Sequence, residues 1–134
     1  MLRAKAPAQG KLRELRVLLV EDSWLLADLL AARLEEEGAF VQGPFSKACD
    51  AIAHLQDNTI DIALVDMVLK DSCADGLIDW LIERGVPYAI MTGYQALPTN
   101  AGSAAIAVLQ KPLDLKVLVT LLSRFTGSTR TGAA

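Results

Sequence analysis

Short apolar runs alternate along the chain with segments in which apolar residues recur every three or four positions. Five runs of five or six residues each predict a buried β-strand: LRVLLV (15–20), AFVQG (39–43), IDIALV (60–65), PYAIMT (87–92) and AAIAVL (104–109). Residues 23–38, 46–57, 75–85 and 113–125 have the helical period, and Ser23 and Ser46 stand where N-caps are expected. Strands that alternate with helices predict a parallel sheet with helices on both faces.

The link between the fourth and fifth strands departs from this pattern. Its sequence, GYQALPTNAGSA, contains Pro98 and Gly102, which interrupt a helix, so we expect a short or disordered fourth helix. Residues 1–13 and 126–134 are predicted to form a flexible N-terminal arm and a flexible C-terminal tail around one domain at 14–125.

Composition narrows the class of protein. The 134 residues are 52% hydrophobic, which is enough for a core, and the net charge of -3 argues against a domain that grips nucleic acid or an anionic membrane. No apolar run is long enough to cross a bilayer. Cys49 and Cys73 are too few for a disulfide framework, and their spacing matches no metal-ligand pattern. The simplest prediction is a cytoplasmic protein.

Polar residues follow four of the five predicted strands. Glu21-Asp22 ends the first strand, Asp66 the third, Thr92-Gly93 the fourth and Lys111-Pro112 the fifth. Each feature alone has an ordinary explanation as a helix cap or a turn. In a doubly wound sheet, however, the carboxyl ends of the strands meet at one edge, where ligands bind. We therefore expect these side chains to converge.

The converging set has a chemistry in common. Three neighbouring carboxylates repel one another unless a hard cation such as Mg²⁺ lies between them. Lys111 supplies a positive charge, Thr92 a hydroxyl, and Gly93 a main-chain N–H group, all of which suit a phosphoryl ligand. Beside the metal and the lysine, Asp66 could attack phosphorus and form an acyl phosphate. The sequence thus predicts a phosphoryl-transfer site.

Four stretches resemble the receiver domains of two-component response regulators: LLVED (18–22), ALVDMVL (63–69), MTGY (91–94) and VLQKP (108–112). The resemblance covers residues 15–125. It implies a flavodoxin-like fold with five parallel strands in the order 2-1-3-4-5. It also implies that Asp66 is the phosphoacceptor.

The resemblance assigns roles to the residues around Asp66. The implied Mg²⁺ ligands are Asp66, Asp22 directly, Glu21 through water and the main-chain carbonyl of Val68. The implied phosphoryl contacts are Thr92, Lys111 and the main-chain N–H groups of Met67 and Gly93.

Two departures from the family pattern concern switching. Receivers usually carry an aromatic residue three positions before the lysine, where this chain has Val108, and a proline after the phosphoacceptor strand, where it has Lys70. AIMTGYQAL with VLQKP is similar to the FAT-GUY group of single-domain receivers. That likeness implies that Tyr94 and the segment 93–105 replace the aromatic switch.

The resemblance implies a single-domain response regulator, not an enzyme, that is phosphorylated by a sensor histidine kinase. It would signal to a histidine phosphotransfer protein or another target protein. The alternatives are a phosphate sink or relay without its own output, and a receiver-like module that takes no phosphate. A phosphohydrolase of the haloacid dehalogenase type normally has a second Asp where this chain has Val68. A dinucleotide-binding enzyme fails because no G-x-G-x-x-G follows the first strand.

Overall fold

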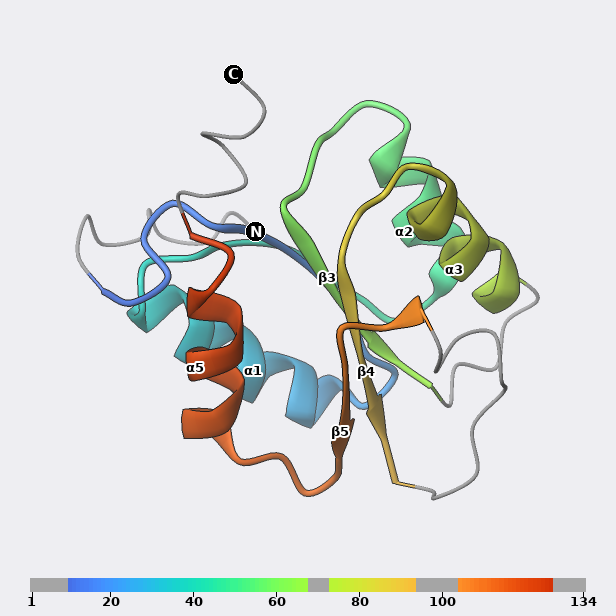
Figure 1. Ribbon diagram of the computed structural model, residues 1–134. Coiled ribbons are helices and arrows are strands. Elements are labelled where there is room, and N and C mark those ends of the chain that lie inside the picture. The colour runs from blue at the N-terminus through green and yellow to red at the C-terminus, as the bar shows by residue number, and fades with distance from the viewer. Residues whose placement is uncertain (1–9, 68–72, 94–103, 127–134) are drawn as a thin grey trace.

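The computed structural model describes residues 10–67, 73–93 and 104–126, which form a five-stranded parallel sheet between two pairs of helices (Figure 1). In chain order the elements are β1 (Arg16–Val20), α1 (Trp24–Glu36), β2 (Phe40–Phe45), α2 (Ala48–Leu55), β3 (Ile62–Asp66), α3 (Ala74–Glu83), β4 (Tyr88–Thr92), β5 (Ala107–Gln110) and α5 (Leu115–Ser123). The segment predicted to contain a short fourth helix lies mostly outside the described residues.

The strand order is β2-β1-β3-β4-β5, and every neighbouring pair is parallel. This confirms the predicted flavodoxin-like topology. The register places Asp66 beside Met91 and Thr92 beside Gln110, so the ends of β3, β4 and β5 lie at one edge. β3 and β4 are buried along their whole length, as expected for strands covered on both faces.

Each face of the sheet has its own hydrophobic core. Helices α1 and α5 cover one face, and α2 and α3 cover the other (Figure 1). Leu19 and Leu64 belong to the first core, whereas Leu18 and Val65 belong to the second. This alternation follows from the two-residue period of a strand, which sends successive side chains to opposite faces.

One of the two predicted helix caps is present in the structure. Ser23 caps α1 by accepting from the Leu26 N–H. The Asp114 carboxylate, which was not predicted as a cap, caps α5. The predicted cap at Ser46 is wrong, because α2 begins one residue later, after Lys47, which makes no side-chain cap bond. β5 also begins at Ala107, three residues later than predicted.

The last residues assigned to the N-terminal arm pack on the domain. Leu12 is fully buried in the α1–α5 core, and its N–H donates to the Glu37 carbonyl at 2.8 Å. In the sequence, Leu12 is an isolated apolar residue among charged residues and a glycine, so no hydrophobic period predicts its burial. The packed structure therefore includes Leu12, and the rest of the domain division stays a prediction.

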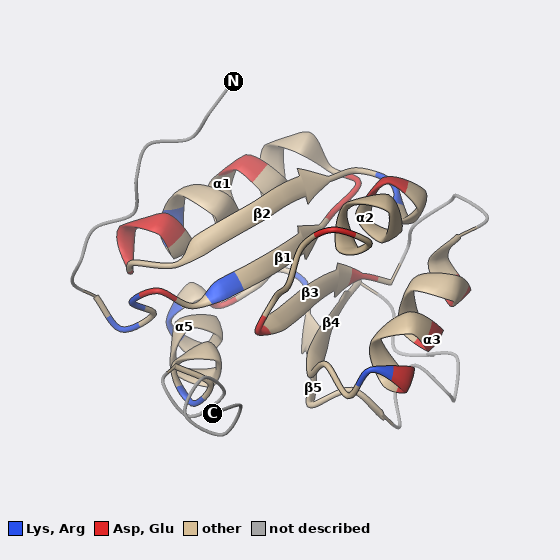
Figure 2. Ribbon diagram, turned by 90° about the horizontal axis from the view of Figure 1, so that it is seen from above, with Lys and Arg blue, Asp and Glu red and all other residues tan. Residues whose placement is uncertain are grey.

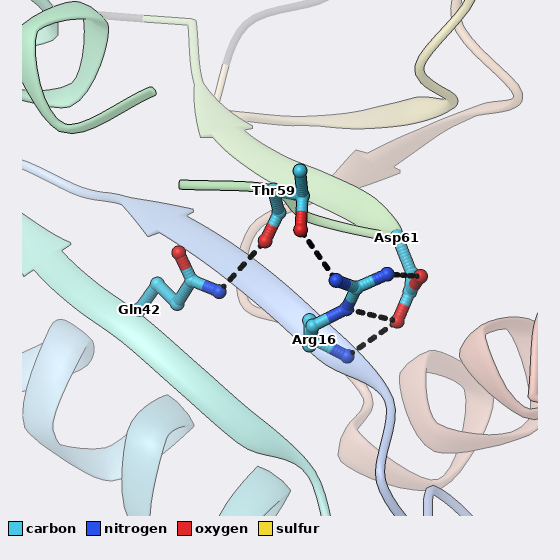
Figure 3. Close-up of polar contacts among 4 residues, drawn as sticks. All are labelled: Arg16, Gln42, Thr59 and Asp61. Carbon is cyan, nitrogen blue, oxygen red and sulfur yellow. Dashed lines mark hydrogen bonds and ion pairs between the residues drawn. The ribbon is translucent and has the colours of Figure 1, made fainter. Parts of the chain in front are cut away.

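A charged cluster joins β1 to β3 at the amino ends of the strands (Figure 3). The Arg16 Nη2 atom lies 2.8 Å from Asp61 Oδ1. The Nε–H group of Arg16 donates to Asp61 Oδ2 at 3.2 Å, and the main-chain N–H of Arg16 donates to the same oxygen at 2.8 Å. Arg16 also donates to the Thr59 hydroxyl, and the Gln42 amide donates to the Thr59 carbonyl at 3.0 Å. Because hydrogen bonds and charge compensate the buried Asp61, this cluster fixes the two strands to each other.

Candidate phosphoryl-transfer site

A second cluster of charges lies at the opposite, carboxyl ends of the strands. Figure 2 shows acidic segments at the arrowheads of β1 and β3, at the end of the sheet opposite the basic start of β1. Glu21 is 1% exposed, Asp66 3% and Thr92 2%, and together with Asp61 they are the buried polar or charged residues of the described chain. Burial of two carboxylates side by side requires compensation.

Lys111 provides that compensation. Its Nζ atom lies 3.0 Å from Glu21 Oε1 and 3.3 Å from Asp66 Oδ1. It also donates to Glu21 Oε2 at 3.3 Å. The contact with Oε1 is an ion pair without a well-aligned hydrogen bond. One half-buried ammonium group therefore links the ends of β1 and β3 from the end of β5.

The backbone holds these side chains in place. The Glu21 N–H donates to the Phe45 carbonyl at 2.8 Å, which fixes the end of β1 against β2, and the Ser23 N–H donates to Glu21 Oε2 at 3.0 Å. The Lys111 N–H donates to the Thr92 carbonyl at 2.7 Å. The site residues thus stand on strand ends that main-chain hydrogen bonds hold together, which suits preorganised chemistry.

The electrostatics of the site show an excess of negative charge. Burial, together with the neighbouring Asp66, raises the pKa of Glu21, although the Ser23 N–H and Lys111 act in the opposite direction. Burial alone would lower the pKa of Lys111, but its contacts with Glu21 and Asp66 outweigh burial and raise it. The single ammonium group therefore does not fully offset the two buried carboxylates.

This excess charge fits a divalent cation in its donor chemistry, because hard cations prefer carboxylate oxygens. Glu21 and Asp66 lie together, and Asp22 follows Glu21 but is exposed. Within residues 10–67, 73–93 and 104–126, no three acidic, histidine or cysteine side chains already converge as a metal-binding group. Val68, whose carbonyl was the fourth predicted ligand, lies outside the described residues. The metal set stays a prediction.

The residues predicted to contact the phosphoryl group or to take part in switching differ in their exposure and hydrogen bonding. Gly93 is exposed, and a Cβ atom there would meet no atom within 4 Å, so its main chain faces open space. The Met67 N–H donates to the Met91 carbonyl at 2.9 Å and is engaged within the sheet end. Val108 is 44% exposed on the edge strand β5, and Tyr94 lies outside the described residues.

Sequence reasoning missed one covalent feature beside the site. Cys49 in α2 and Cys73, the residue before α3, form a disulfide, where the sequence suggested only that two cysteines cannot make a disulfide framework. The signal that could have found it is topological. With strand order 2-1-3-4-5, α2 and α3 pack on the same face of the sheet and bring their N-terminal ends together.

Sequence comparisons identify response regulators as relatives. Two regulators described as putative NtrX-like response regulators, from Rickettsia conorii and Rickettsia felis, are each 29% identical over 118 residues, which are 83% of this chain and 25% of theirs. The regulatory protein VanRc of Enterococcus gallinarum is 38% identical over 56 residues, 42% of this chain and 24% of that protein. The chain thus spans about a quarter of the length of these relatives. No family model matches.

Comparison with solved structures gives the same class of domain. A CheY-like receiver domain from Methanospirillum hungatei JF-1 superposes with a TM-score of 0.77 at 22% identity, covering 89% of this chain and 98% of that one. The receiver domain of a modulated diguanylate cyclase from Desulfovibrio desulfuricans G20 has the same TM-score and coverages at 27% identity. As for membranes, no helix in the described part of the chain is both long and apolar enough to cross one.

Proposed function

Since the chain is a CheY-like receiver domain of the response-regulator type, we propose that Asp66 accepts a phosphoryl group from the phosphohistidine of a sensor kinase. The observation that carries this proposal is the Lys111 ammonium group, which lies within 3.3 Å of both Glu21 and the buried Asp66 carboxylate. Thr92 ends the next strand in the sheet. A carboxylate held beside a cation, at a strand end next to the one that carries a hydroxyl, is arranged for attack on phosphorus.

The transfer is a displacement at phosphorus. An Asp66 carboxylate oxygen forms the new P–O bond while the P–N bond of the phosphohistidine breaks, and the histidine nitrogen keeps the electron pair. Lys111 and the Thr92 hydroxyl neutralise charge on the phosphoryl oxygens. The product is an acyl phosphate, which water hydrolyses, so the modification is transient.

Mg²⁺ would be held by Glu21, Asp66 and Asp22, and it would supply charge neutralisation for the phosphoryl oxygens. The support for this is geometric: two buried carboxylates, Glu21 and Asp66, share the single ammonium group of Lys111. When the group on Asp66 changes from a carboxylate to an acyl phosphate, Lys111 and Thr92 acquire a bulkier and more anionic neighbour. That change of charge is the signal a partner would read.

The partner surface nearest to this chemistry is the start of α1. Trp24, Leu25 and Leu29 are 75%, 67% and 55% exposed, and Trp24 stands two positions after Asp22. Large apolar side chains left exposed beside a site are typical of protein contacts. We therefore expect Leu25→Ser to slow transfer from a phosphorylated sensor kinase without changing phosphorylation by acetyl phosphate. The FAT-GUY grouping and the stand-alone arrangement stay predictions.

Intact mass after incubation with Mg²⁺ and acetyl phosphate tests the proposal. Wild type should gain one phosphoryl group, whereas Asp66→Asn should gain none. The exposed Asp79 on α3 supplies a matched control, and Asp79→Asn should react as wild type. Omission of Mg²⁺ should suppress the reaction.

Beryllofluoride, which mimics a phosphoryl group, provides a second readout. An adduct on wild type and on Asp79→Asn, but not on Asp66→Asn, is expected. Absence of phosphoryl transfer from both acetyl phosphate and a phosphorylated kinase, together with absence of the adduct, would overturn the proposal. An equal mass gain on Asp66→Asn would place the acceptor elsewhere.

A further inference from the structure

The Cys49–Cys73 pair lies at the start of α2 and directly before α3, on the face of the sheet away from α1 and α5. The two Cα atoms are 5.1 Å apart, within the usual range for disulfides. They are the two cysteines of the chain, so neither has a competing partner within it.

Both cysteines are only partly buried. Thiol–disulfide exchange requires a thiolate to approach one sulfur in line with the bond, so partial exposure leaves the pair open to small and protein dithiols. The predicted cytoplasmic location would keep the two groups as thiols by default. The disulfide would then form only on oxidation of the protein and would not be a permanent part of the fold.

Contacts other than the disulfide also hold α2 and α3 together. Helices α2 and α3 also pack through buried apolar residues, among them Ala51 and Leu77, and the position of Gly76 brings α3 close to Ile52. Reduction therefore removes one covalent tie and leaves the hydrophobic contacts in place. A bond with this property can open and close without unfolding the domain.

The pair is linked to Asp66 by a short stretch of chain. Cys73 stands seven positions after Asp66, and the 24-residue separation of the cysteines encloses β3 with the phosphoacceptor. At one end of that stretch the Met67 N–H is bonded to the Met91 carbonyl. At the other end the disulfide ties Cys73 to α2. Oxidation thus adds a covalent restraint at Cys73, seven positions after the proposed acceptor.

We propose that Cys49 and Cys73 are a redox-active pair whose oxidation slows phosphoryl transfer to Asp66. The proposal rests on the proposed function for its effect, but not for the redox chemistry itself. The physical reason is that residues next to Asp66 must adjust around a larger, more anionic group. A covalent anchor at Cys73, added to the hydrogen bond at Met67, makes that adjustment more costly.

The redox step exchanges two electrons and two protons. In reduction, the thiolate of a dithiol attacks one sulfur of the pair, the Cys49–Cys73 bond breaks, and a mixed disulfide forms. The second thiol of the reductant then displaces the remaining cysteine and becomes oxidised, and both cysteines end as thiols. In oxidation a low-molecular-weight disulfide, such as oxidised glutathione, undergoes the reverse exchange and is reduced to two thiols.

The test compares wild type and Cys49→Ser/Cys73→Ser after treatment with dithiothreitol or with oxidised glutathione. Alkylation by N-ethylmaleimide followed by intact mass reports the thiols. We expect no alkylation of oxidised wild type, two adducts after reduction, and full reversal on reoxidation. Two N-ethylmaleimide adducts on glutathione-treated wild type would refute the redox-active pair. One glutathione adduct on each cysteine, in place of an internal disulfide, would also refute it.

The rate of phosphorylation by acetyl phosphate with Mg²⁺ reports the coupling. Oxidised wild type should react about fivefold or more slowly than reduced wild type, a size typical of coupled sites. The double serine variant should react like reduced wild type under both treatments. Equal rates for the two redox forms of wild type would overturn the coupling. If neither wild type nor the double variant is phosphorylated in any state, the proposed function fails as well, while the alkylation result still decides the redox pair.

Discussion

Replacement of Glu21 by Gln removes one negative charge from the buried acidic cluster and keeps the shape of the side chain. The Gln carbonyl can still accept from the Ser23 N–H, which now donates to Oε2. In the absence of metal we expect this variant to be more stable than wild type, because the pKa of Glu21 is raised by burial and by Asp66. A raised pKa means that the fold disfavours the ionised carboxylate.

The magnitude follows from three opposing contributions. At an effective dielectric constant of about 20, attraction between Lys111 Nζ and Glu21 Oε1 at 3.0 Å is worth about 5.5 kcal/mol. Distances of 3.0 and 3.3 Å to the same Nζ place Glu21 Oε1 and Asp66 Oδ1 at most 6.3 Å apart, so their repulsion is at least about 2.5 kcal/mol. Desolvation of a carboxylate costs several kcal/mol. These contributions nearly cancel, and the raised pKa indicates that the unfavourable ones exceed the attraction. We expect a gain of about 1 kcal/mol, or about 3 to 5 °C in Tm.

The pH dependence of the difference in stability provides a test of the same sign. A carboxyl group with a raised folded-state pKa contributes stability that is fully present below its unfolded pKa and is lost as pH rises through the folded value. For Glu21, this loss of stability begins as pH rises above the ordinary pKa of 4.5. The advantage of Glu21→Gln should therefore be absent at lower pH, grow as pH rises, and level off once Glu21 is ionised in the folded protein.

Mg²⁺ should reverse the order of the two proteins. A cation bound only to the folded state stabilises it by about 1.4 kcal/mol at ten times its dissociation constant. Wild type should gain this, and Glu21→Gln should gain less. Urea unfolding with EDTA or with Mg²⁺ measures both effects. Glu36→Gln, at an exposed position of α1, is the matched control and should change stability by less than about 0.5 kcal/mol. A Glu21→Gln variant less stable than wild type in EDTA at neutral pH would refute the charge argument.

Three further changes test other parts of the structure. Asp61→Asn should lower the free energy of unfolding by about 2 kcal/mol in urea, since it weakens a buried pair with a partly exposed arginine, whereas exposed Asp57→Asn should have little effect. Lys111→Met should abolish most phosphorylation. The stability of this variant relative to wild type should fall as pH rises above about 4.5, because Glu21 loses the contact that lowers its pKa. A difference in stability that does not vary with pH in thermal melts would count against this reasoning. Leu64→Ala should cost about 3 kcal/mol by leaving a cavity beside β3, measured by the same urea titration.

The parallel sheet was predictable because the relevant signals are local, whereas its strand order was implied by the resemblance to receiver domains. Apolar runs such as IALV need only neighbouring residues to be recognised, and their alternation with helices predicts parallel strands, whose carboxyl ends lie at one edge of the sheet. The meeting of Glu21, Asp66 and Lys111 follows from that arrangement. Their pairing distances confirm the convergence that four strand ends suggested.

Features that depend on relative position in space were not predictable in the same way. Ser46 had the chemistry of a cap, but α2 begins after Lys47, and a cap is decided by backbone dihedral angles. Leu12 is buried because it meets the end of α1, which no periodicity near it indicates. The pairing of Cys49 with Cys73 required knowing that two helices on one face begin side by side.

The two charged clusters at opposite ends of β1 and β3 differ in charge balance, and that difference separates a structural role from a chemical one. Arg16 and Asp61 match one positive charge with one negative charge, and hydrogen bonds from Arg16 reach both carboxylate oxygens. Glu21 and Asp66 share one ammonium group. Loss of a charge should therefore destabilise the first cluster under all conditions. At Glu21 it should stabilise the metal-free fold while weakening the proposed cation binding. This opposite response, within the same two strands, is what a site that trades stability for reactivity should show.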